Sequence, residues 1–347
     1  MPDTINPNLS RAPSKRPSAQ QLFADLTGAS HRRALGKAIS LLESKQPEDQ
    51  GIADELIDLA RSQVQSMDNP TLRLGVSGTP GVGKSTFVEN FGLAVIEAGH
   101  RLAVLAIDPT SSLSGGSILG DKTRMQELSR HPRAYIRPSP SAGHLGGTTA
   151  ATRGAILLCE AAGYDFVIVE TVGVGQAEWR VHGMTDAFLL LAQPAAGDDL
   201  QSIKRGILEL ADHIVVNKAD ALPEAADLTA RQLRQGLHLA PPRTDGWAVK
   251  VDTVSALTGQ GLAETLGRLL LFHRQNLASG GLARKRAAQE TAWLHERLEQ
   301  RLRADLARYL SGPARTSDEL RRIIDGEVSQ ADGLRVLLTD FYRNQQP

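Results

Sequence analysis

A glycine-rich turn between an apolar run and a helix constrains this chain more than any other feature. The turn and the start of the helix read Gly78-Thr79-Pro80-Gly81-Val82-Gly83-Lys84-Ser85-Thr86. The Gly-x-x-x-x-Gly-Lys-Ser spacing is typical of a phosphate-binding loop, whose glycines let backbone N–H groups converge on phosphate oxygens. The helix presents the positive end of its dipole to the same oxygens. We therefore expect this run to bind a nucleoside triphosphate, with Lys84 reaching the β- and γ-phosphates and the Ser85 hydroxyl ligating Mg²⁺.

The charge balance narrows the class of partner. The chain has 347 residues, with 39 Lys and Arg against 39 Asp and Glu, so we expect no binding of nucleic acid or anionic membranes. No apolar run approaches the roughly 20 residues of a membrane span. Residues 1–17 lack the apolar core of a secretory signal, and we expect a cytoplasmic protein. The one cysteine, Cys159, excludes an intramolecular disulfide and is expected to be a small buried apolar residue.

The hydrophobic pattern divides the chain into four segments. Residues 1–17 contain four prolines and are predicted to be a disordered tail. Residues 18–67 repeat apolar side chains at three- or four-residue spacing, which predicts helices, with Pro47 separating two of them. Residues 68–275 alternate short apolar runs with helical stretches, and residues 276–347 form a charged helical arm.

The segment 68–275 predicts an α/β fold, in which a mostly parallel sheet carries helices on both faces. Near-continuous apolar runs between helices are typical of strands that are buried on both sides. Ligands of such sheets bind beyond the carboxyl ends of the strands. We expect strands at 72–77, 102–107, 134–137, 166–170, 187–192, 213–217 and 248–254.

A second motif, Asn217-Lys218-Ala219-Asp220, directly follows the apolar run 214–216. The Asp220 carboxylate can accept from guanine N1–H and from the 2-amino group, whereas adenine offers neither donor. A buried carboxylate without donors is costly, so the preference for guanine can be large. We expect Asn217 to position the base edge and the Lys218 stem to lie over the ring. Backbone groups of Ser255, Ala256 and Leu257 suit a contact to guanine O6, so the expected nucleotide is GTP or GDP.

Acidic residues follow the apolar runs near the phosphate-binding loop. Asp108 comes directly after residues 102–107, Asp121 lies thirteen residues later, and Glu170 ends the run 166–169. Mg²⁺ takes hard oxygen ligands, and strand-end carboxylates beside a phosphate-binding loop supply them. The candidate metal residues are Ser85, Asp108, Asp121 and Glu170, with Asp121 the one most open to an ordinary capping role.

Three runs in the sequence resemble the MeaB/ArgK family, whose animal member is MMAA. They are Asp108-Pro109-Thr110-Ser111-Ser112, Gly115-Gly116-Ser117-Ile118-Leu119-Gly120-Asp121-Lys122-Thr123-Arg124-Met125 and Glu170-Thr171-Val172-Gly173-Val174-Gly175-Gln176. The resemblance covers roughly residues 20–310. Members of this family are GTPases that chaperone adenosylcobalamin-dependent acyl-CoA mutases such as methylmalonyl-CoA mutase.

The resemblance implies a homodimer formed through the C-terminal arm and mobile switches near 108–124 and 170–178. It also implies a third switch, in which Asp198, Gln201 and Lys204 relay the nucleotide state to the mutase and Lys204 moves toward the phosphates. No tightly bound cobalamin is expected. Two departures from the family pattern are Ala177 and the run Gln193-Pro194-Ala195-Ala196, and the alanines near 195 are expected to stiffen the third switch.

A leucine stripe marks the C-terminal arm. Leu294, Leu298, Leu302, Leu306 and Leu310 recur every four residues on a helix that is otherwise rich in Arg and Glu. The stripe packs either on its own domain or on another copy of the chain.

The expected reaction is slow GTP hydrolysis that a mutase accelerates. The candidate catalytic residues are Lys84, Asp121, Glu170, Gln176 and Lys204, and the group that positions the attacking water stays open among Glu170, Gln176 and Asp121. One alternative is a related metal-delivery GTPase, which usually needs a Cys/His cluster that this sequence does not display. Another is a scaffold that uses bound GTP only to stabilise a dimer.

Overall fold

The fold is taken from a computed structural model, which describes residues 17–28, 31–44, 46–107, 125–137, 145–171, 177–194, 205–239, 243, 245–311, 318 and 321–344. The predicted tail 1–17 lies outside the described residues except for Pro17. The chain divides into two compact units, Met1–Arg286 and Ala287–Pro347. No described helix is long and apolar enough to cross a membrane.

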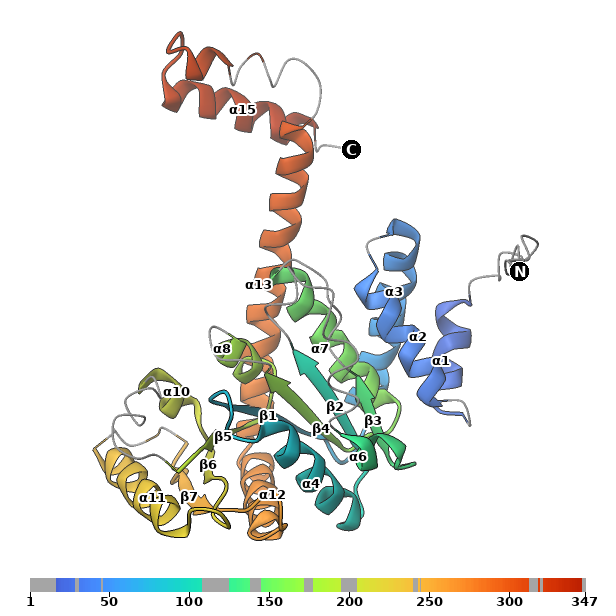
Figure 1. Cartoon of the computed structure of the whole chain (residues 1–347). Helices are drawn as coiled ribbons and strands as arrows, with labels where there is room; N and C mark the ends of the chain where they lie inside the picture. Colours follow the sequence, from blue (N-terminus) through green and yellow to red (C-terminus); the bar gives the residue numbers. More distant parts are fainter. Residues whose placement is uncertain are drawn as a thin grey trace, which may run out of the picture. The chain divides into compact units, whose positions relative to one another are not determined.

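A seven-stranded sheet forms the centre of the first unit (Figure 1). Every pairing between its strands is parallel, and the strand order is β3-β2-β4-β1-β5-β6-β7. This confirms the predicted α/β class. The strands are β1 (Leu72–Gly78), β2 (Leu102–Ile107), β3 (Ala134–Arg137), β4 (Phe166–Thr171), β5 (Ala187–Ala192), β6 (His213–Val216) and β7 (Lys250–Thr253).

The last two strands are shorter than predicted. The predicted strand 213–217 ends one residue early, because the backbone turns at Lys218, whose φ is 61°. The predicted strand 248–254 keeps only the four residues that pair with β6, from Lys250 to Thr253. Both turns lie at the carboxyl end of the sheet, where a ligand would bind.

Helices cover both faces of the sheet, and successive strand residues face opposite cores. In β4, Val167 and Val169 join the core beneath α7, whereas Phe166 and Ile168 join the core beneath α4. Such two-sided burial explains the near-continuous apolar runs in the sequence. The helices of this segment are α4 (Lys84–Glu97), α6 (Gln126–Arg130), α7 (Leu145–Ala161), α8 (Ala177–His182), α10 (Arg205–Leu210), α11 (Pro223–His238) and α12 (Leu262–Ala278).

Three helices precede the sheet: α1 (Ala19–Leu26), α2 (His31–Glu43) and α3 (Pro47–Gln65). Ser18 and Gln21 form a reciprocal capping box at the start of α1, and Pro47 occupies the first turn of α3. The N-terminal helices share a buried core with α7. A Cβ added at Gly154 of α7 would lie 2.8 Å from Leu42 Cδ1, so α7 and α2 approach closely there.

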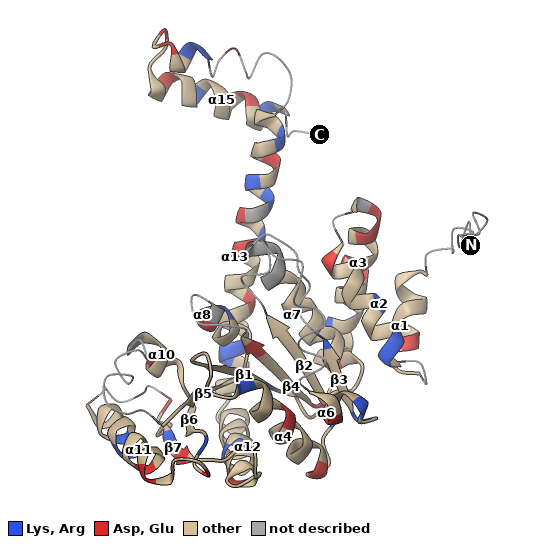
Figure 2. Cartoon of the chain, in the orientation of Figure 1, with Lys and Arg blue, Asp and Glu red and all other residues tan. Residues whose placement is uncertain are grey.

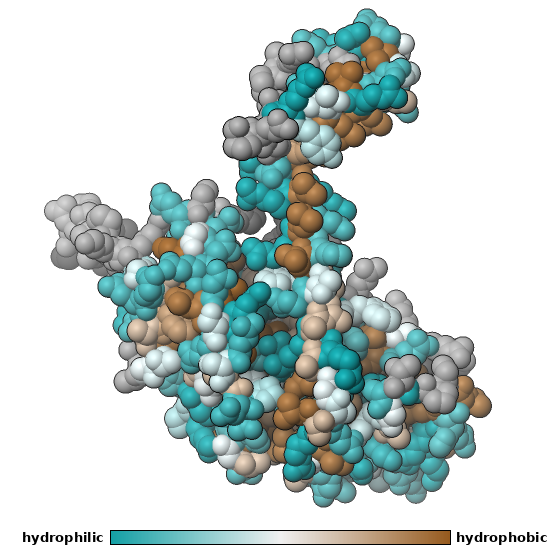
Figure 3. Space-filling model, turned by 180° about the vertical axis from the view of Figure 1, so that it is seen from behind, coloured by the Kyte–Doolittle hydropathy of each residue, from teal (hydrophilic) through white to brown (hydrophobic). Residues whose placement is uncertain are grey.

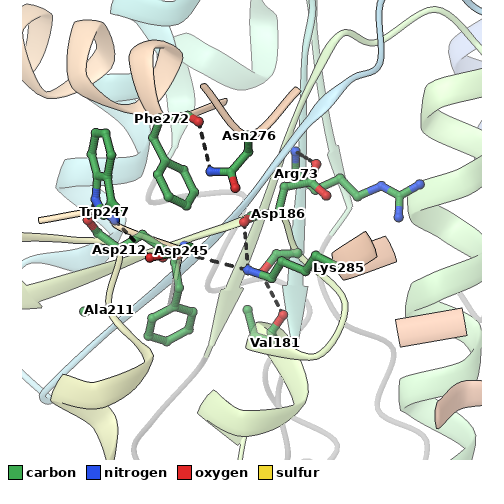
Figure 4. Close-up of polar contacts among 12 residues, drawn as sticks. Arg73, Val181, Asp186, Ala211, Asp212, Asp245, Trp247, Phe272, Asn276 and Lys285 are labelled. Carbon is green, nitrogen blue, oxygen red and sulfur yellow. Dashed lines mark hydrogen bonds and ion pairs between the residues drawn. The ribbon is translucent and has the colours of Figure 1, made fainter. Parts of the chain in front are cut away.

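A buried charge network joins the amino edge of the sheet to the first turn of α13 (Gly281–Leu310). Asp186, just before β5, accepts from Arg286 at 2.6 and 2.9 Å and from the backbone N–H of Arg73 at 3.0 Å. Lys285 donates to the backbone oxygen of Asp186 at 2.8 Å and lies 4.0 Å from the Asp212 carboxylate (Figure 4). The network holds the first turn of α13, up to Arg286, within the first unit.

The second unit contains the rest of α13 and α15 (Gln330–Asn344). Tyr309 donates to Asp340 at 2.9 Å, and its ring meets Phe341 edge to face at 5.5 Å. Lysines and arginines alternate with acidic residues along α13 (Figure 2). Hydrophobic side chains line one side of the same helix (Figure 3), including Leu294, Leu298 and Leu302, which are 64, 57 and 50% exposed.

Candidate nucleotide-binding site

The turn between β1 and α4 has the backbone geometry of a phosphate-binding loop. Gly81 and Gly83 take positive φ angles of 78° and 91°, and α4 begins at Lys84. A Cβ on Gly78 would lie 2.6 Å from the backbone oxygen of Leu191, so only glycine fits there. Thr79 to Thr86 continue from this glycine across the turn into the first turn of α4. The loop therefore aims backbone N–H groups and a helix N-terminus at the carboxyl end of the sheet.

Lys84 is held inside this loop. Its Nζ donates to the backbone oxygen of Gly78. Burial lowers the pKa of Lys84, and the negative charges of Glu170 and Glu178 act in the opposite direction. Glu178 is fully buried in the first turn of α8, which packs over β1 and β4. No residue-level prediction singled out Glu178, although it ends the family run Val-Gly-Val-Gly-Gln-x-Glu that the sequence contains.

The guanine motif is joined to the phosphate-binding loop by hydrogen bonds. Asn217 Nδ2 donates to the backbone oxygen of Val82 at 2.8 Å. Lys218 Nζ donates to the backbone oxygen of Gly81 at 2.6 Å, which lays its stem along the loop. Asp220 is exposed, so its carboxylate is open to a ligand. The two motifs, 133 residues apart between Lys84 and Asn217, thus form one site.

The loop after β7 closes the other side of this site. The backbone N–H of Ala256 donates to Asn217 Oδ1 at 2.9 Å. Ser255 Oγ accepts from the backbone N–H of Thr258 at 3.1 Å, which makes a local turn. Asn90 Nδ2 of α4 donates to the backbone oxygen of Ala256 at 2.8 Å. Ser255 and Ala256 are buried, whereas the Leu257 side chain is 75% exposed.

Of the candidate metal residues, Glu170 and Ser85 lie among the described residues. Glu170 pairs in register with Val76 of β1 and Ala106 of β2 and is 3% exposed. Ser85, in the first turn of α4, adds a hydroxyl, so the described part of the site offers the hard oxygen donors that fit Mg²⁺. No group of three or more potential metal-ligating side chains occurs among the described residues themselves. The predicted residues Asp108, Asp121, Gln176, Asp198, Gln201 and Lys204 lie outside the described residues.

The helices that follow two of the expected switches touch each other. Helix α8 begins after residues 172–176, and α10 begins after residues 195–204. A Cβ on Gly206 of α10 would lie 3.6 Å from Trp179 Cζ2 of α8, in ordinary van der Waals contact. The Trp179 side chain is nevertheless 56% exposed.

Comparison with protein families identifies the family of the chain. The model of the family described as methylmalonyl Co-A mutase-associated GTPase MeaB matches residues 35–309. The chain belongs to the MeaB family. The resemblance that the sequence runs indicated is confirmed, and the protein is a GTP hydrolase.

Several relatives, two of them named as GTPases, match this MeaB-family chain over most of its length. A putative GTPase of Caulobacter vibrioides is 46% identical over 90% of this chain and 95% of the relative. The GTPase ArgK of Escherichia coli is 42% identical over 90% of this chain and 94% of the relative. The mitochondrial methylmalonic aciduria type A homolog of Mus musculus is 44% identical over 89% and 76%. A solved structure of an LAO/AO transport system kinase superposes with a TM-score of 0.70, at 34% identity over 94% of this chain and 97% of that one.

Cys159 lies in the core of the MeaB-family fold rather than at the site. It is fully buried in α7, and burial raises the pKa of its thiol. This confirms the packing role predicted for it. A protonated, enclosed thiol is a poor metal ligand.

Proposed function

We propose that this MeaB-family GTPase binds GTP with Mg²⁺ and acts as a chaperone for an adenosylcobalamin-dependent acyl-CoA mutase, with methylmalonyl-CoA mutase the first candidate. The observation that carries the proposal is that hydrogen bonds join three loops at the carboxyl end of the sheet. Hydrogen bonds from Asn217 and Lys218 connect the guanine motif with the phosphate-binding loop. The family description, a mutase-associated GTPase, supplies the class of partner.

At the phosphate end, the roles follow from charge. Backbone N–H groups of residues 78–86, apart from Pro80, which has none, would bind the phosphate oxygens, and Lys84 would leave the Gly78 carbonyl to neutralise the β- and γ-phosphates. Mg²⁺ would supply further charge neutralisation, held by Ser85 and by one or more of Asp108, Asp121 and Glu170.

At the base end, the roles follow from hydrogen-bond donors and acceptors. The exposed Asp220 carboxylate would accept from guanine N1–H and the 2-amino group. Asn217 and the Lys218 stem would hold the plane of the base, and the loop of Ser255, Ala256 and Leu257 would donate to O6. An analogue without the 2-amino group would leave Asp220 short of a donor and bind more weakly.

Hydrolysis would be slow without a partner, because an unassisted GTPase site lacks a cation that stabilises the transferring phosphoryl group. We assign that partner-dependent role to Lys204, with Asp198 and Gln201 relaying the state of the nucleotide. Asp121, Glu170 and Gln176 remain the candidates for positioning the attacking water. Hydrolysis would gate loading of adenosylcobalamin into the mutase, and the GTPase itself would hold no cobalamin tightly.

We further propose that residues 18–67 support the GTPase domain 68–275 and that the arm 276–347 forms a homodimer. The tail 1–17 is assigned no role in nucleotide binding. The proposed compartment is the cytoplasm, where GTP and an acyl-CoA mutase would meet this protein.

The test measures GTP turnover by the purified protein alone and with a purified acyl-CoA mutase. We expect a slow basal rate that the mutase raises at least about tenfold, as activating partners do for other GTPases. A Lys204→Ala variant should keep the basal rate and lose the acceleration. A mutase that neither binds the GTPase nor changes its turnover would contradict the chaperone role and leave a GTPase with another partner, such as a metal-enzyme precursor.

A further inference from the structure

Both backbone polar groups of Ala256 are hydrogen-bonded to asparagine side chains. Its N–H donates to Asn217 Oδ1 at 2.9 Å, and its carbonyl accepts from Asn90 Nδ2 at 2.8 Å. Asn217 is part of the guanine motif, and a positioning role was expected for it. Asn90 belongs to no motif and lies six residues after Lys84 on the helix that follows the phosphate-binding loop.

The two asparagines close a ring of hydrogen bonds. Asn217 Nδ2 donates to the backbone oxygen of Val82 in the phosphate-binding loop, and Asn90 lies on α4, which continues from the same loop. The loop after β7 is therefore fastened to one rigid loop–helix element at two points. Space in the ring is tight, because a Cβ on Gly83 would lie 2.9 Å from Asn217 Nδ2.

The ring also determines which backbone donors remain for a ligand. Ser255 N–H donates to the Gln260 carbonyl at 3.0 Å, and Ala256 N–H donates to Asn217. Among Ser255, Ala256 and Leu257, only the Leu257 N–H has no acceptor within the part of the chain that the structure describes. Its orientation depends on the Ala256 peptide, which Asn90 holds.

We propose that Asn90 is a positioning residue for guanine recognition. By fixing the Ala256 carbonyl to α4, it aims the Leu257 N–H, which lies in the same peptide plane, at O6 of the base. It thereby couples base recognition to the helix whose first turn binds the phosphates. The inference rests on the proposed guanine site and adds to it a residue that touches no atom of the nucleotide.

An alternative role for Asn90 is ordinary helix support. Its Nδ2 also lies 3.3 Å from the backbone oxygen of Thr86, one turn earlier in α4. That contact is long and lies within the helix, whereas the contact to Ala256 is 0.5 Å shorter and joins two elements. A local role would affect every ligand equally, and a positioning role would not.

The experiment compares GDP with 6-thio-GDP, in which sulfur replaces O6 and accepts hydrogen bonds weakly. Binding of both to the full chain with Mg²⁺ is measured by calorimetry for the native protein, Asn90→Ala and Asn90→Asp. For Asn90→Ala we expect GDP to bind about tenfold more weakly and 6-thio-GDP less than about threefold more weakly, which corresponds to the loss of one hydrogen bond to O6. Asn90→Asp should bind GDP more weakly still, because a carboxylate would face the Ala256 carbonyl.

Two controls keep the result interpretable. Glu97→Ala changes an exposed residue at the end of α4 and should leave both affinities unchanged. Thermal unfolding without nucleotide checks that each variant folds. If Asn90→Ala does not fold, the isosteric Asn90→Asp variant takes its place in the comparison.

Equal losses for GDP and 6-thio-GDP, or no loss for either, would overturn the role of Asn90. Asp220→Asn separates this failure from failure of the site itself, since it should weaken GDP binding and improve binding of xanthosine diphosphate. If Asp220→Asn gains affinity for xanthosine diphosphate but Asn90→Ala weakens GDP and 6-thio-GDP equally, the guanine site stands and only the role of Asn90 is wrong. If Asp220→Asn leaves the base preference unchanged, the guanine site and the inference both fall.

Discussion

Gly78 shows how closely single residues are constrained where the sheet meets the nucleotide site. A Cβ there would lie 2.6 Å from the backbone oxygen and 2.8 Å from the Cβ of Leu191 on the neighbouring strand. Neither atom is the end of a flexible side chain, so the backbone itself would have to move. The glycine is therefore required by its surroundings as well as by phosphate binding.

We expect Gly78→Ala to lower the free energy of unfolding by about 1–3 kcal/mol, as overpacking does, and to weaken GDP binding at least about tenfold by displacing the loop. Urea unfolding and calorimetry measure the two effects. Gly236→Ala is the matched control, because an added Cβ on α11 would meet nothing within 4 Å. A Gly78→Ala protein with native stability and affinity would show that the loop tolerates the displacement.

Asp186 has a shifted pKa with a consequence for stability. Burial raises the pKa of this carboxyl, but Arg286 and Arg73 outweigh burial and bring it below its ordinary value. A lowered folded pKa stabilises the protein above the unfolded pKa of about 3.9, and this contribution is lost as the pH falls through the folded value.

We predict that Asp186→Asn lowers the free energy of unfolding by about 3 kcal/mol at pH 7, because the part-buried Arg286 loses its nearest carboxylate and keeps, among the described carboxylates, only Glu160 at 3.8 Å. The difference from the native protein should shrink as the pH falls below about 4. Urea unfolding at several pH values measures it. Asp325→Asn, on the exposed surface, should show no such difference, and a pH-independent gap for Asp186→Asn would contradict the assigned charge.

Motif residues could be predicted from the sequence, and their supporting residues could not. The positions of Lys84, Asn217 and Glu170 follow from spacings that the chemistry of phosphate and guanine requires. Asn90 contacts Ala256, a distant part of the chain, and local patterns do not encode such a contact. Asn90 reads as one more polar residue on an amphipathic helix.

Among the elements, α7 and the N-terminal helices depend on one close approach. Gly154 leaves room for Leu42 of α2 and Ile57 of α3, whose Cδ1 atoms would lie 2.8 and 3.0 Å from an added Cβ. Both are ends of flexible side chains, so a methyl group can be accommodated more easily than a larger side chain.

We expect Gly154→Leu to destabilise the protein by about 1–3 kcal/mol through overpacking and to expose α1–α3 to proteolysis before the sheet domain. Limited proteolysis followed by mass spectrometry, with urea unfolding, measures both. Gly51→Ala on α3, where an added Cβ meets nothing within 4 Å, should be neutral or slightly stabilising. Simultaneous cleavage of both regions would show that the N-terminal helices do not unfold separately.

At this scale, the type of each element was easier to predict than its ends. Because the strands are buried on both faces, they occur in the sequence as apolar runs, and these runs predicted the α/β class. The ends of β6 and β7 were missed because they are set by hydrogen bonds to the nucleotide loops, such as Ala219 N–H to the Val254 carbonyl at 3.0 Å. Hydrophobic periodicity carries no information about such contacts.

At the scale of the whole molecule, the leucine stripe of α13 is an exposed apolar surface that a partner could cover. Leu294, Leu298 and Leu302 are each at least half exposed on a helix with charges of both signs. We propose that a second copy covers them in a homodimer, because contiguous exposed apolar surface marks association sites.

The double variant Leu298→Glu/Leu302→Glu should therefore raise the dissociation constant of the dimer at least about 100-fold, since charges would be buried without partners. Sedimentation velocity over a range of concentrations measures this constant. Arg303→Ala removes an exposed charge from the same helix and should leave it unchanged. A double variant that dimerises normally would assign the interface to another surface.

The packing of α8 against α10, near Trp179 and Gly206, has a consequence for how this protein can be controlled. Helices α8 and α10 each continue from a segment expected to respond to the nucleotide, and their packing makes independent motion sterically difficult. An effector that binds either helix must therefore disturb both, and the half-exposed Trp179 indole between the two helices offers a surface for binding. Hydrolysis and partner release would then depend on one coupled movement of α8 and α10 instead of on two independent movements.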